Sequence, residues 1–457
     1  MTHSTSSPLL DGDISNTLKS MTLPMLIGML TLMSFNLVDT FFISMLGTEQ
    51  LAAISFTFPV TFTVISLGIG LSIGTSAIIA RALGARRHNE AKADGNGALW
   101  LTTFLVALLS LLGYLLINPL FILLGAEAGI LGHIRDYMVL WFAGSVLLVT
   151  PMVGNAILRA AGDTKTPSLI MACSGVLNAL LDPLLIFGWG PVPAMGMQGA
   201  ALASVLSWGA GCLLILQQLL RRQLITPGWQ PLSIFIPICR RILKIGLPAA
   251  GANMLTPLAM AVLTAIMAAH GAAAVAAYGV GARLESIASL VILALSMTLP
   301  PFISQNFGAG RLDRVQQAYR ICTRFVLGWQ FIVYLLLIAL AWPLAWLFTS
   351  DEQVATYIRW FIWLVPLAYG LQGITILTNS SFNALHQPGK ALLLSIIRLF
   401  VFYVPFAWAG GVLFGVMGLF IGCVLANLCT AILAYYGFNL LLNQQQLKTT
   451  DPEVKEI

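Results

Sequence analysis

Charged residues are scarce in this chain. Asp, Glu, Lys and Arg together make up 9% of its 457 residues, whereas an ordinary soluble protein has roughly 25%. Hydrophobic residues make up 58%, and the mean hydropathy is +0.89. A soluble core cannot cover so much apolar surface, so the composition indicates a polytopic membrane protein. The net charge of +6 does not predict a nucleic-acid partner, because the basic residues lie in short segments between apolar stretches.

Motifs of catalysis and cofactor binding are also missing. The chain has no Walker A, HExxH, GxSxG or Rossmann pattern, so nothing predicts ATP hydrolysis or an enzyme active site. The six cysteines form no CxxC pair and have no zinc spacing, so we interpret them as packing residues. No cleavable signal is recognisable, and the first apolar stretch would itself direct insertion. We therefore expect a protein that is not an enzyme and that has no cofactor.

Apolar stretches long enough to cross a hydrocarbon core of ~30 Å occur twelve times. The predicted fold class is therefore an all-α integral membrane protein with twelve transmembrane helices. The stretch 221–240 contains three prolines and separates two sets of six. It divides the chain into an N-lobe (1–220), a connecting loop (221–240) and a C-lobe with a polar tail (241–457). The predicted spans are 17–44, 51–80, 96–123, 130–158, 166–189, 196–220, 241–268, 275–305, 317–349, 355–380, 390–413 and 416–442.

The two sets of six are a repeat. One constant shift in residue number places Pro24 on Pro248 and Gly47 on Gly271, and we call it the repeat shift. An even number of spans per copy makes both copies enter the membrane in the same direction. We therefore expect two pseudo-symmetric bundles with a binding cavity between them near the midplane. Further matches are Gly84 with Gly308, Arg87 with Arg311 and, at a slightly smaller shift, Gly196 with Gly415 and Gly199 with Gly418.

Lysine and arginine predict the orientation in the membrane. The N-terminal tail and the even-numbered loops hold most of them, whereas the odd-numbered loops hold little beyond Arg135 and Arg359. Because positive residues favour the inner side, we expect both termini in the cytoplasm.

Three acids fall inside predicted spans: Asp39, Asp182 and Glu285. A charge at a bilayer centre costs at least ~2.5–3.5 kcal/mol, so such residues are usually functional. For Glu285, a structural ion pair is the better interpretation, since Arg283 is two residues away and could pair with it or with a neighbouring helix. For Asp39 and Asp182 we favour a functional role over a buried cluster that only fixes helix packing.

The first two acids are predicted to lie at similar depth. Asp39 follows Lys19 by twenty residues, about 30 Å of helix, and Asp182 follows Lys165 by seventeen residues, about 25 Å. Asn178 shares a helix face with Asp182, four residues on. Two carboxylates and an amide make a polar pocket in an apolar wall, and such a pair titrates as a unit.

The repeat provides an internal control for this pocket. Asn36 precedes Asp39 by three residues and adds a second amide. In the second copy, Asp39 is replaced by Leu263 and Asp182 by Phe406. A polar cluster needed only for packing would be expected in both copies, so the asymmetry favours a function in the first bundle.

These features resemble the multidrug and toxic compound extrusion (MATE) family over nearly the whole chain. The motifs that carry the resemblance are Leu23-Pro24, Val38-Asp39-Thr40, Arg159-Ala160-Ala161-Gly162-Asp163, the run LNALLD from Leu177 to Asp182, and GMQGAALAS from Gly196 to Ser204. Spans 7 and 10 lack the acids of the NorM-like branch, so the chain resembles the DinF-like branch.

The resemblance implies roles for individual residues. Asp39, Asn178 and Asp182 match the cation or proton site of the DinF-like branch, and Pro24 matches its span-1 hinge. The resemblance also implies that Tyr137, Asn155 and Ser204 line the substrate cavity. The coupling ion would be H⁺, with Na⁺ at Asp39, Asn178 and Asp182 as the alternative.

The resemblance further implies efflux of drugs and toxic organic cations by cation-coupled antiport, with alternating access and bending of helix 1. The expected location is the plasma (inner) membrane of a prokaryote, among membrane lipids, and we expect a monomer. Two alternatives remain: a Na⁺-coupled exporter, and a flippase for lipids or lipid-linked oligosaccharides. A flippase would need several cations for pyrophosphate, and the spans offer only Arg283 and Arg398.

Overall fold

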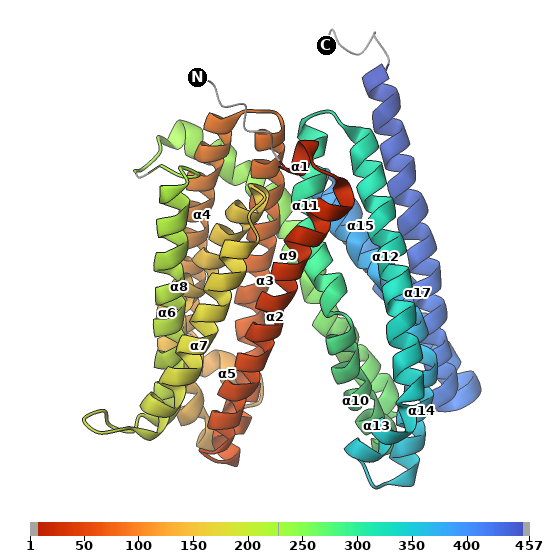
Figure 1. Cartoon of the computed structure of the whole chain (residues 1–457). Helices are drawn as coiled ribbons and strands as arrows, with labels where there is room; N and C mark the ends of the chain where they lie inside the picture. The colour runs from red at the N-terminus through yellow and green to blue at the C-terminus, as the bar shows by residue number, and fades with distance from the viewer. Residues whose placement is uncertain (1–7, 227, 451–457) are drawn as a thin grey trace. The chain divides into compact units, whose positions relative to one another are not determined.

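The computed structural model describes residues 8–226 and 228–450 (Figure 1). Within these ranges the chain is nearly all helix, and no strand is formed. Eleven helical segments are long and apolar enough to cross a membrane. One of them, Pro388–Leu447, covers two predicted spans. It counts as two crossings, because the backbone leaves helical geometry between them, at Phe414 and Gly415. The prediction of an all-helical protein with twelve crossings is therefore confirmed.

The first six crossings use eight helices. The third crossing is divided near Leu116 into α4 and α5, whereas the second, fourth, fifth and sixth are single unbroken helices. The bounds are α1 Pro8–Asp11, α2 Ile14–Ser44, α3 Thr48–Gly84, α4 His88–Leu115, α5 Ile117–Leu123, α6 Ala128–Ala160, α7 Lys165–Phe187 and α8 Gly196–Arg221.

The last six crossings are interrupted more often. Span 8 breaks at Ser289, span 10 contains a 3₁₀ turn, and span 11 contains a π-helical segment. The bounds are α9 Leu232–Ala268, α10 Ala272–Ala288, α11 Leu290–Gly308, α12 Leu312–Ala339, α13 Ala341–Phe348, α14 Glu352–Leu364, η1 Val365–Ala368, α15 Tyr369–Ala384, α16 Pro388–Ile396, η2 Ile397–Tyr403 and α17 Val404–Thr450.

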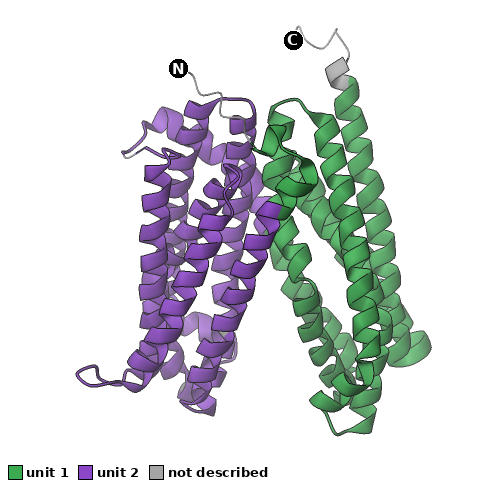
Figure 2. Cartoon of the chain, in the orientation of Figure 1, with its two compact units in different colours: residues 1–19, 251–457 green, residues 20–250 purple. Residues whose placement is uncertain are grey.

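The chain forms two compact units, which are coloured separately in Figure 2. The first comprises Ser20–Ala250, and we call it the acid-pair unit because it contains Asp39 and Asp182. The second, which we call the C-terminal unit, comprises Met1–Lys19 with Gly251–Ile457. The chain passes from one unit to the other inside α2 and inside α9, whereas the predicted lobes divide in the connection 221–240. Those lobe boundaries stay a prediction.

Glycines allow close helix packing in the acid-pair unit. A Cβ on Gly70 of α3 would lie 2.7 Å from the Cβ of Ala250 and closer still to the carbonyl oxygen of Gly246. The next turn repeats the contact, since Gly74 faces Ile242 of α9. Small residues four apart let helix backbones approach in this way. The first part of α9 is thereby held against α3 within this unit.

The N-terminal helix α1 is anchored within the C-terminal unit. Asn306 donates a hydrogen bond to the carbonyl oxygen of Leu9 (3.0 Å), and Arg314 donates to that of Gly12 (2.7 Å). Arg311 donates to the carbonyl oxygen of Leu10 and pairs with Asp11 at 3.1 Å. These bonds satisfy carbonyl groups at the end of a four-residue helix, which would otherwise have too few partners to be stable.

The backbone carries the repeat that the sequence predicts. Gly47 (φ 136°) and Gly271 (φ 100°), which the repeat shift relates, both precede a helix with positive φ. Arg87 and Arg311 have nearly identical backbone angles, −92° and 66° against −91° and 66°. Because local geometry recurs at one constant shift, the two six-span sets are two copies of one folding pattern.

Candidate cation-coupling site

Helices α2 and α7 pack side by side within the acid-pair unit. Gly28 of α2 faces Ser168 of α7, where an added Cβ would lie 3.0 Å from the Ser168 Cα. One level further, Phe35 of α2 lies over Gly175 of α7. Both contacts join residues with the same separation in the chain, so the two helices run parallel. The same packing brings the next polar residues, Asp39 and Asp182, to one level.

Asp39 and Asp182 form a pair. Each lies five residues before the end of its helix, at Ser44 and Phe187 respectively, which agrees with the similar depth predicted from the sequence. The two carboxyl groups lie close enough to interact directly with each other. Because an ionised carboxylate can only accept, a hydrogen bond between the two groups would need at least one proton on the pair.

Two buried oxygens of the pair have no hydrogen-bond partner. Asp182 is completely buried, and Asn178 Nδ2 donates to its Oδ1 at 3.2 Å. The other oxygen, Asp182 Oδ2, is buried without a hydrogen-bond partner, and so is Asp39 Oδ1. A buried oxygen without a partner is costly, and a proton or a small cation would satisfy it.

Two other predicted residues, Pro24 and Asn36, lie in α2 with Asp39. Pro24 is inside α2, fifteen residues before Asp39, and removes one hydrogen bond from the helix interior. Asn36 also belongs to α2, but its side chain lies outside the described part of the structure. Pro183 follows Asp182 directly inside α7 and frees a carbonyl one turn earlier.

The predicted cavity residues lie at different levels. Tyr137 of α6 interacts electrostatically with both Asp39 and Asp182, so it belongs to the surroundings of the pair. Asn155 lies eighteen residues further along α6, about 27 Å away. Ser204 of α8 is buried, and its neighbour Val205 contacts Gly144 of α6. Gly144 lies about 10 Å beyond Tyr137 along α6. The structure thus brings Tyr137 to the acids and leaves Asn155 at another level, whereas the contacts of α8 with α7 at Gly199 and Gly211 place Ser204 near the level of Asp182.

Glu285 has partners that differ from the favoured prediction. It forms no ion pair with Arg283, which is exposed. Instead Gln372 Nε2 donates to Glu285 Oε1 at 2.9 Å, and Arg398 interacts with Glu285 electrostatically. The predicted ion pair is therefore not formed, and the residues that interact with Glu285 come from α15 and η2. Sequence spacing gave no signal for them, because all three lie on different helices.

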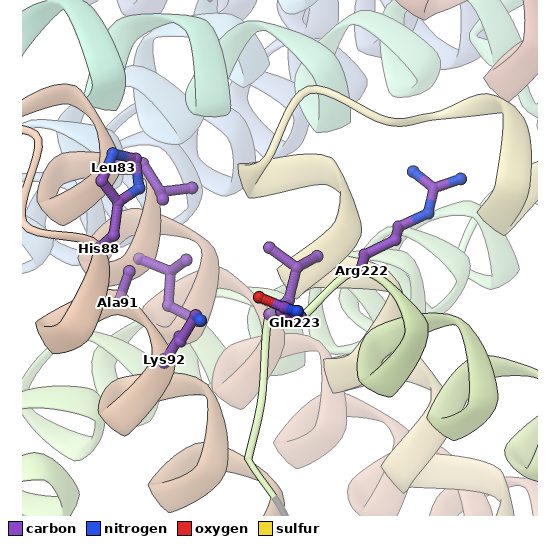
Figure 3. A pocket seen from close by; sticks show the side chains of 8 residues that line it. Leu83, His88, Ala91, Lys92, Arg222 and Gln223 are labelled. Carbon is purple, nitrogen blue, oxygen red and sulfur yellow. The ribbon is translucent and has the colours of Figure 1, made fainter. Parts of the chain in front are cut away.

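A separate hollow of about 240 Å³ lies where α3 and α8 end and α4 begins (Figure 3). It is lined by His88, Lys92, Arg222 and Gln223 among others, and it contains neither acid of the pair. Figure 3 shows the Arg222 side chain extending away from the other labelled residues, and its guanidinium forms a salt bridge with Asp163. The hollow is smaller than the ~300–1,000 Å³ of typical ligand pockets.

The twelve crossings, the repeat and the buried carboxyl pair define a class of protein: a secondary transporter, not an enzyme. The MatE family profile matches residues 24–184 and 248–409, and these two stretches begin at positions that the repeat shift relates. The chain therefore belongs to the MATE family.

Individual relatives agree with this assignment. The FAD transporter of Shewanella oneidensis is 43% identical over 454 residues, which cover 97% of this chain and 98% of that protein. The probable multidrug resistance protein NorM of Thermotoga maritima is 26% identical over 86% of this chain and 85% of its own. The crystal structure of the Vibrio cholerae MATE transporter VcmN in the bent form is 36% identical, with a TM-score of 0.90, and covers 95% of this chain and 98% of that chain.

Proposed function

We propose that this protein exports a flavin dinucleotide across the plasma membrane of a prokaryote, driven by protons that bind to Asp39 and Asp182. The observation that supports coupling is the carboxyl pair, in which two acids lie close together and each keeps one buried oxygen without a hydrogen-bond partner. Both termini are expected in the cytoplasm, and the assignment to the DinF-like branch rests on the position of this pair.

The proposed cycle follows from the charge of the pair. When both carboxyls are neutral, the pair is inexpensive to bury, and α2 can pack closely on α7. When a proton leaves, the remaining charge attracts water or a cation and favours a different packing of α2. Proton uptake on the outer side then accompanies release of cargo, and proton release on the inner side accompanies binding of the next molecule. Pro24 is the proposed bending point of α2.

The driving force is sufficient for such a cycle. One charge moved through a membrane potential supplies ~2.3 kcal/mol per 100 mV, and one proton supplies ~1.36 kcal/mol per pH unit. Na⁺ is the alternative coupling ion, since two carboxylates and the Asn178 amide offer oxygen ligands of the type that hard cations prefer.

The proposed cargo rests on similarity along the full chain. The relative named as an FAD transporter is 43% identical over nearly all of both proteins, whereas the relatives named as multidrug proteins are about 25% identical. Export of amphipathic organic cations is the second candidate, because those multidrug relatives also cover most of the chain.

Transport in proteoliposomes tests coupling and cargo together. We expect FAD movement under an imposed pH gradient, and loss of this movement in Asp39→Asn. Asp136→Asn is the matched control, because Asp136 is an exposed acid of the same unit whose carboxylate accepts a hydrogen bond from Gln198. Movement driven only by a Na⁺ gradient would change the ion and keep the site.

Other outcomes would redirect the proposal. If ethidium moves and FAD does not, the second candidate replaces the first. If neither compound moves under either gradient, the exporter proposal is wrong, and lipid-linked substrates become the next test. Equal losses in Asp39→Asn and Asp136→Asn would remove the special role of the carboxyl pair.

A further inference from the structure

Three of the breaks in helix geometry in the C-terminal unit lie near polar residues. Span 8 breaks at Ser289, four residues after Glu285. Span 10 has the 3₁₀ turn η1, which ends four residues before Gln372. Span 11 has the π-helix η2, which contains Arg398. Discontinuous helices at membrane depth and π-helical segments both tend to mark binding sites.

These polar residues meet although they come from three spans. Gln372 Nε2 donates to Glu285 Oε1 at 2.9 Å, and the charges of Glu285 and Arg398 interact. The Arg398 guanidinium also lies over the ring of Tyr403, 5.7 Å from its centre. The cluster therefore has one acid, one cation and one amide inside a single compact unit.

Tyrosines surround this cluster. Tyr278 of α10, Tyr369 of α15 and Tyr403 of η2 all interact electrostatically with Glu285. Tyr369 is 1% exposed, and its hydroxyl group is buried without a hydrogen-bond partner. An unused buried donor of this kind is costly, so it indicates a place for an acceptor that the protein does not supply.

Arg398 likewise has donors that the protein does not use. Within the described residues its guanidinium forms no salt bridge and donates no hydrogen bond, and Glu285 interacts with it only at longer range. A guanidinium offers five N–H donors in a planar fork that matches phosphate oxygens. Together with the Tyr369 hydroxyl group, the cluster offers donors for an anion and aromatic rings for a flat ring system.

The other copy of the repeat provides a control. At the repeat shift, Glu285 corresponds to Thr61 and Gln372 corresponds to Leu148. The corresponding helices α3, α6 and α7 are unbroken. Neither the polar residues nor the helix breaks are therefore required by the folding pattern that both copies share.

We propose that Arg398, Gln372 and Tyr369, with Tyr278 and Tyr403 beside them, form a binding site for the pyrophosphate and an adjoining ring of an aromatic dinucleotide. This inference rests on the proposed cargo and deepens it. Glu285 provides the counter-charge of Arg398 when no cargo is bound, because a lone cation in a membrane helix is costly. The phosphate groups replace Glu285 as the partner of Arg398 on binding.

Ligand titration of the purified full-length protein tests this site. The probes are FAD, riboflavin (the same flavin rings without phosphate) and ADP, with binding followed by flavin fluorescence and by calorimetry. In Arg398→Gln we expect FAD and ADP to bind about tenfold more weakly or worse, since charged hydrogen bonds are lost, while riboflavin changes less than about twofold. Glu285→Gln should strengthen FAD binding, because it removes the competitor for Arg398.

Matched variants keep the result interpretable. Arg283→Gln is the control, because Arg283 is an exposed cation on the same helix as Glu285, and it should leave FAD affinity unchanged. Arg398→Lys keeps the charge but not the fork, and should give an intermediate loss. Size-exclusion behaviour and thermal stability exclude misfolded variants.

Each outcome decides one question. If Arg398→Gln weakens FAD and riboflavin equally, or weakens neither, the pyrophosphate site is wrong while the proposed cargo stands. If the unmodified protein binds ADP through Arg398 but does not bind FAD, the anion site stands and the flavin proposal fails. If it binds none of the three probes, both proposals fail.

Discussion

The packing of α2 on α7 predicts the effect of one added methyl group, in Gly175→Ala. A Cβ at Gly175 would lie 2.8 Å from Cε2 and 2.9 Å from Cγ of Phe35, and closer still to Cδ2. Carbon atoms need ~3.5–4.0 Å, so the ring or the helix must move by about 1 Å. Asp39 lies only four residues after Phe35, about 6 Å along α2.

This displacement is large enough to disturb the carboxyl pair. An O–H···O bond spans roughly 2.5–3.0 Å and weakens when its partners separate by about 1 Å. Overpacking of this kind costs ~1–3 kcal/mol. If the strain falls on the state in which α2 packs closely on α7, the apparent affinity for the driving ion decreases roughly 5- to 150-fold.

The assay is cargo transport in proteoliposomes as a function of the imposed pH gradient, together with thermal stability in detergent. Gly209→Ala is the matched control, because its Cβ would make an ordinary contact of 3.6 Å with Leu147 in the same unit. The double variant Gly175→Ala with Phe35→Ala should recover coupling, since the clash is removed. Normal coupling in Gly175→Ala, or no recovery in the double variant, would refute the link between this packing and the pair.

Three further predictions concern other parts of the chain. Pro24→Ala restores a hydrogen bond inside α2, so we expect higher thermal stability and slower transport in the same assay. Arg241→Gln removes the partner of the buried Asp94 carboxylate, now 2.6 Å away. We expect the free energy of unfolding to fall by on the order of 2 kcal/mol, less than for a fully buried pair because Arg241 is half exposed. An added Asp94→Asn should restore it. Gly415→Ala places a side chain at φ 62° and ψ −150°, which should lower the free energy of unfolding by about 1–3 kcal/mol. Gly437→Ala is the control, because its Cβ would meet no atom within 4 Å, and it should be neutral or stabilising in thermal unfolding.

The sequence predicts the spans and the repeat well because both depend on local composition. Length and hydropathy identify each crossing, and one constant shift relates Gly47 to Gly271 and Arg87 to Arg311, where the backbone angles also agree. The acids of the pair stand out because carboxylates are rare in apolar helices, and the spacing of Asn178 and Asp182 predicts their hydrogen bond.

Pro366 marks the 3₁₀ turn η1, but the break at Ser289, the π-helix η2 and the Glu285 cluster could not be predicted in the same way. Neither Ser289 nor the segment Ile397–Tyr403 contains a proline or glycine that would mark an interruption. The partners of Glu285 come from α15 and η2, so their meeting depends on how three helices pack. Single-helix spacing favoured Arg283, which is two residues away in the chain and makes no ion pair with it.

The position where the chain passes between units has a mechanical consequence. The passage lies inside α2 between Lys19 and Ser20, and the same helix continues without interruption to Asp39. Beyond the proposed bending point, the stretch of α2 from Pro24 to Asp39 is an arm of about 22 Å, so a tilt of about 10° at Pro24 displaces Asp39 by about 4 Å. Under the proposed coupling, the residues that carry the ion and the residues before Ser20 therefore belong to one helix, although they belong to different units.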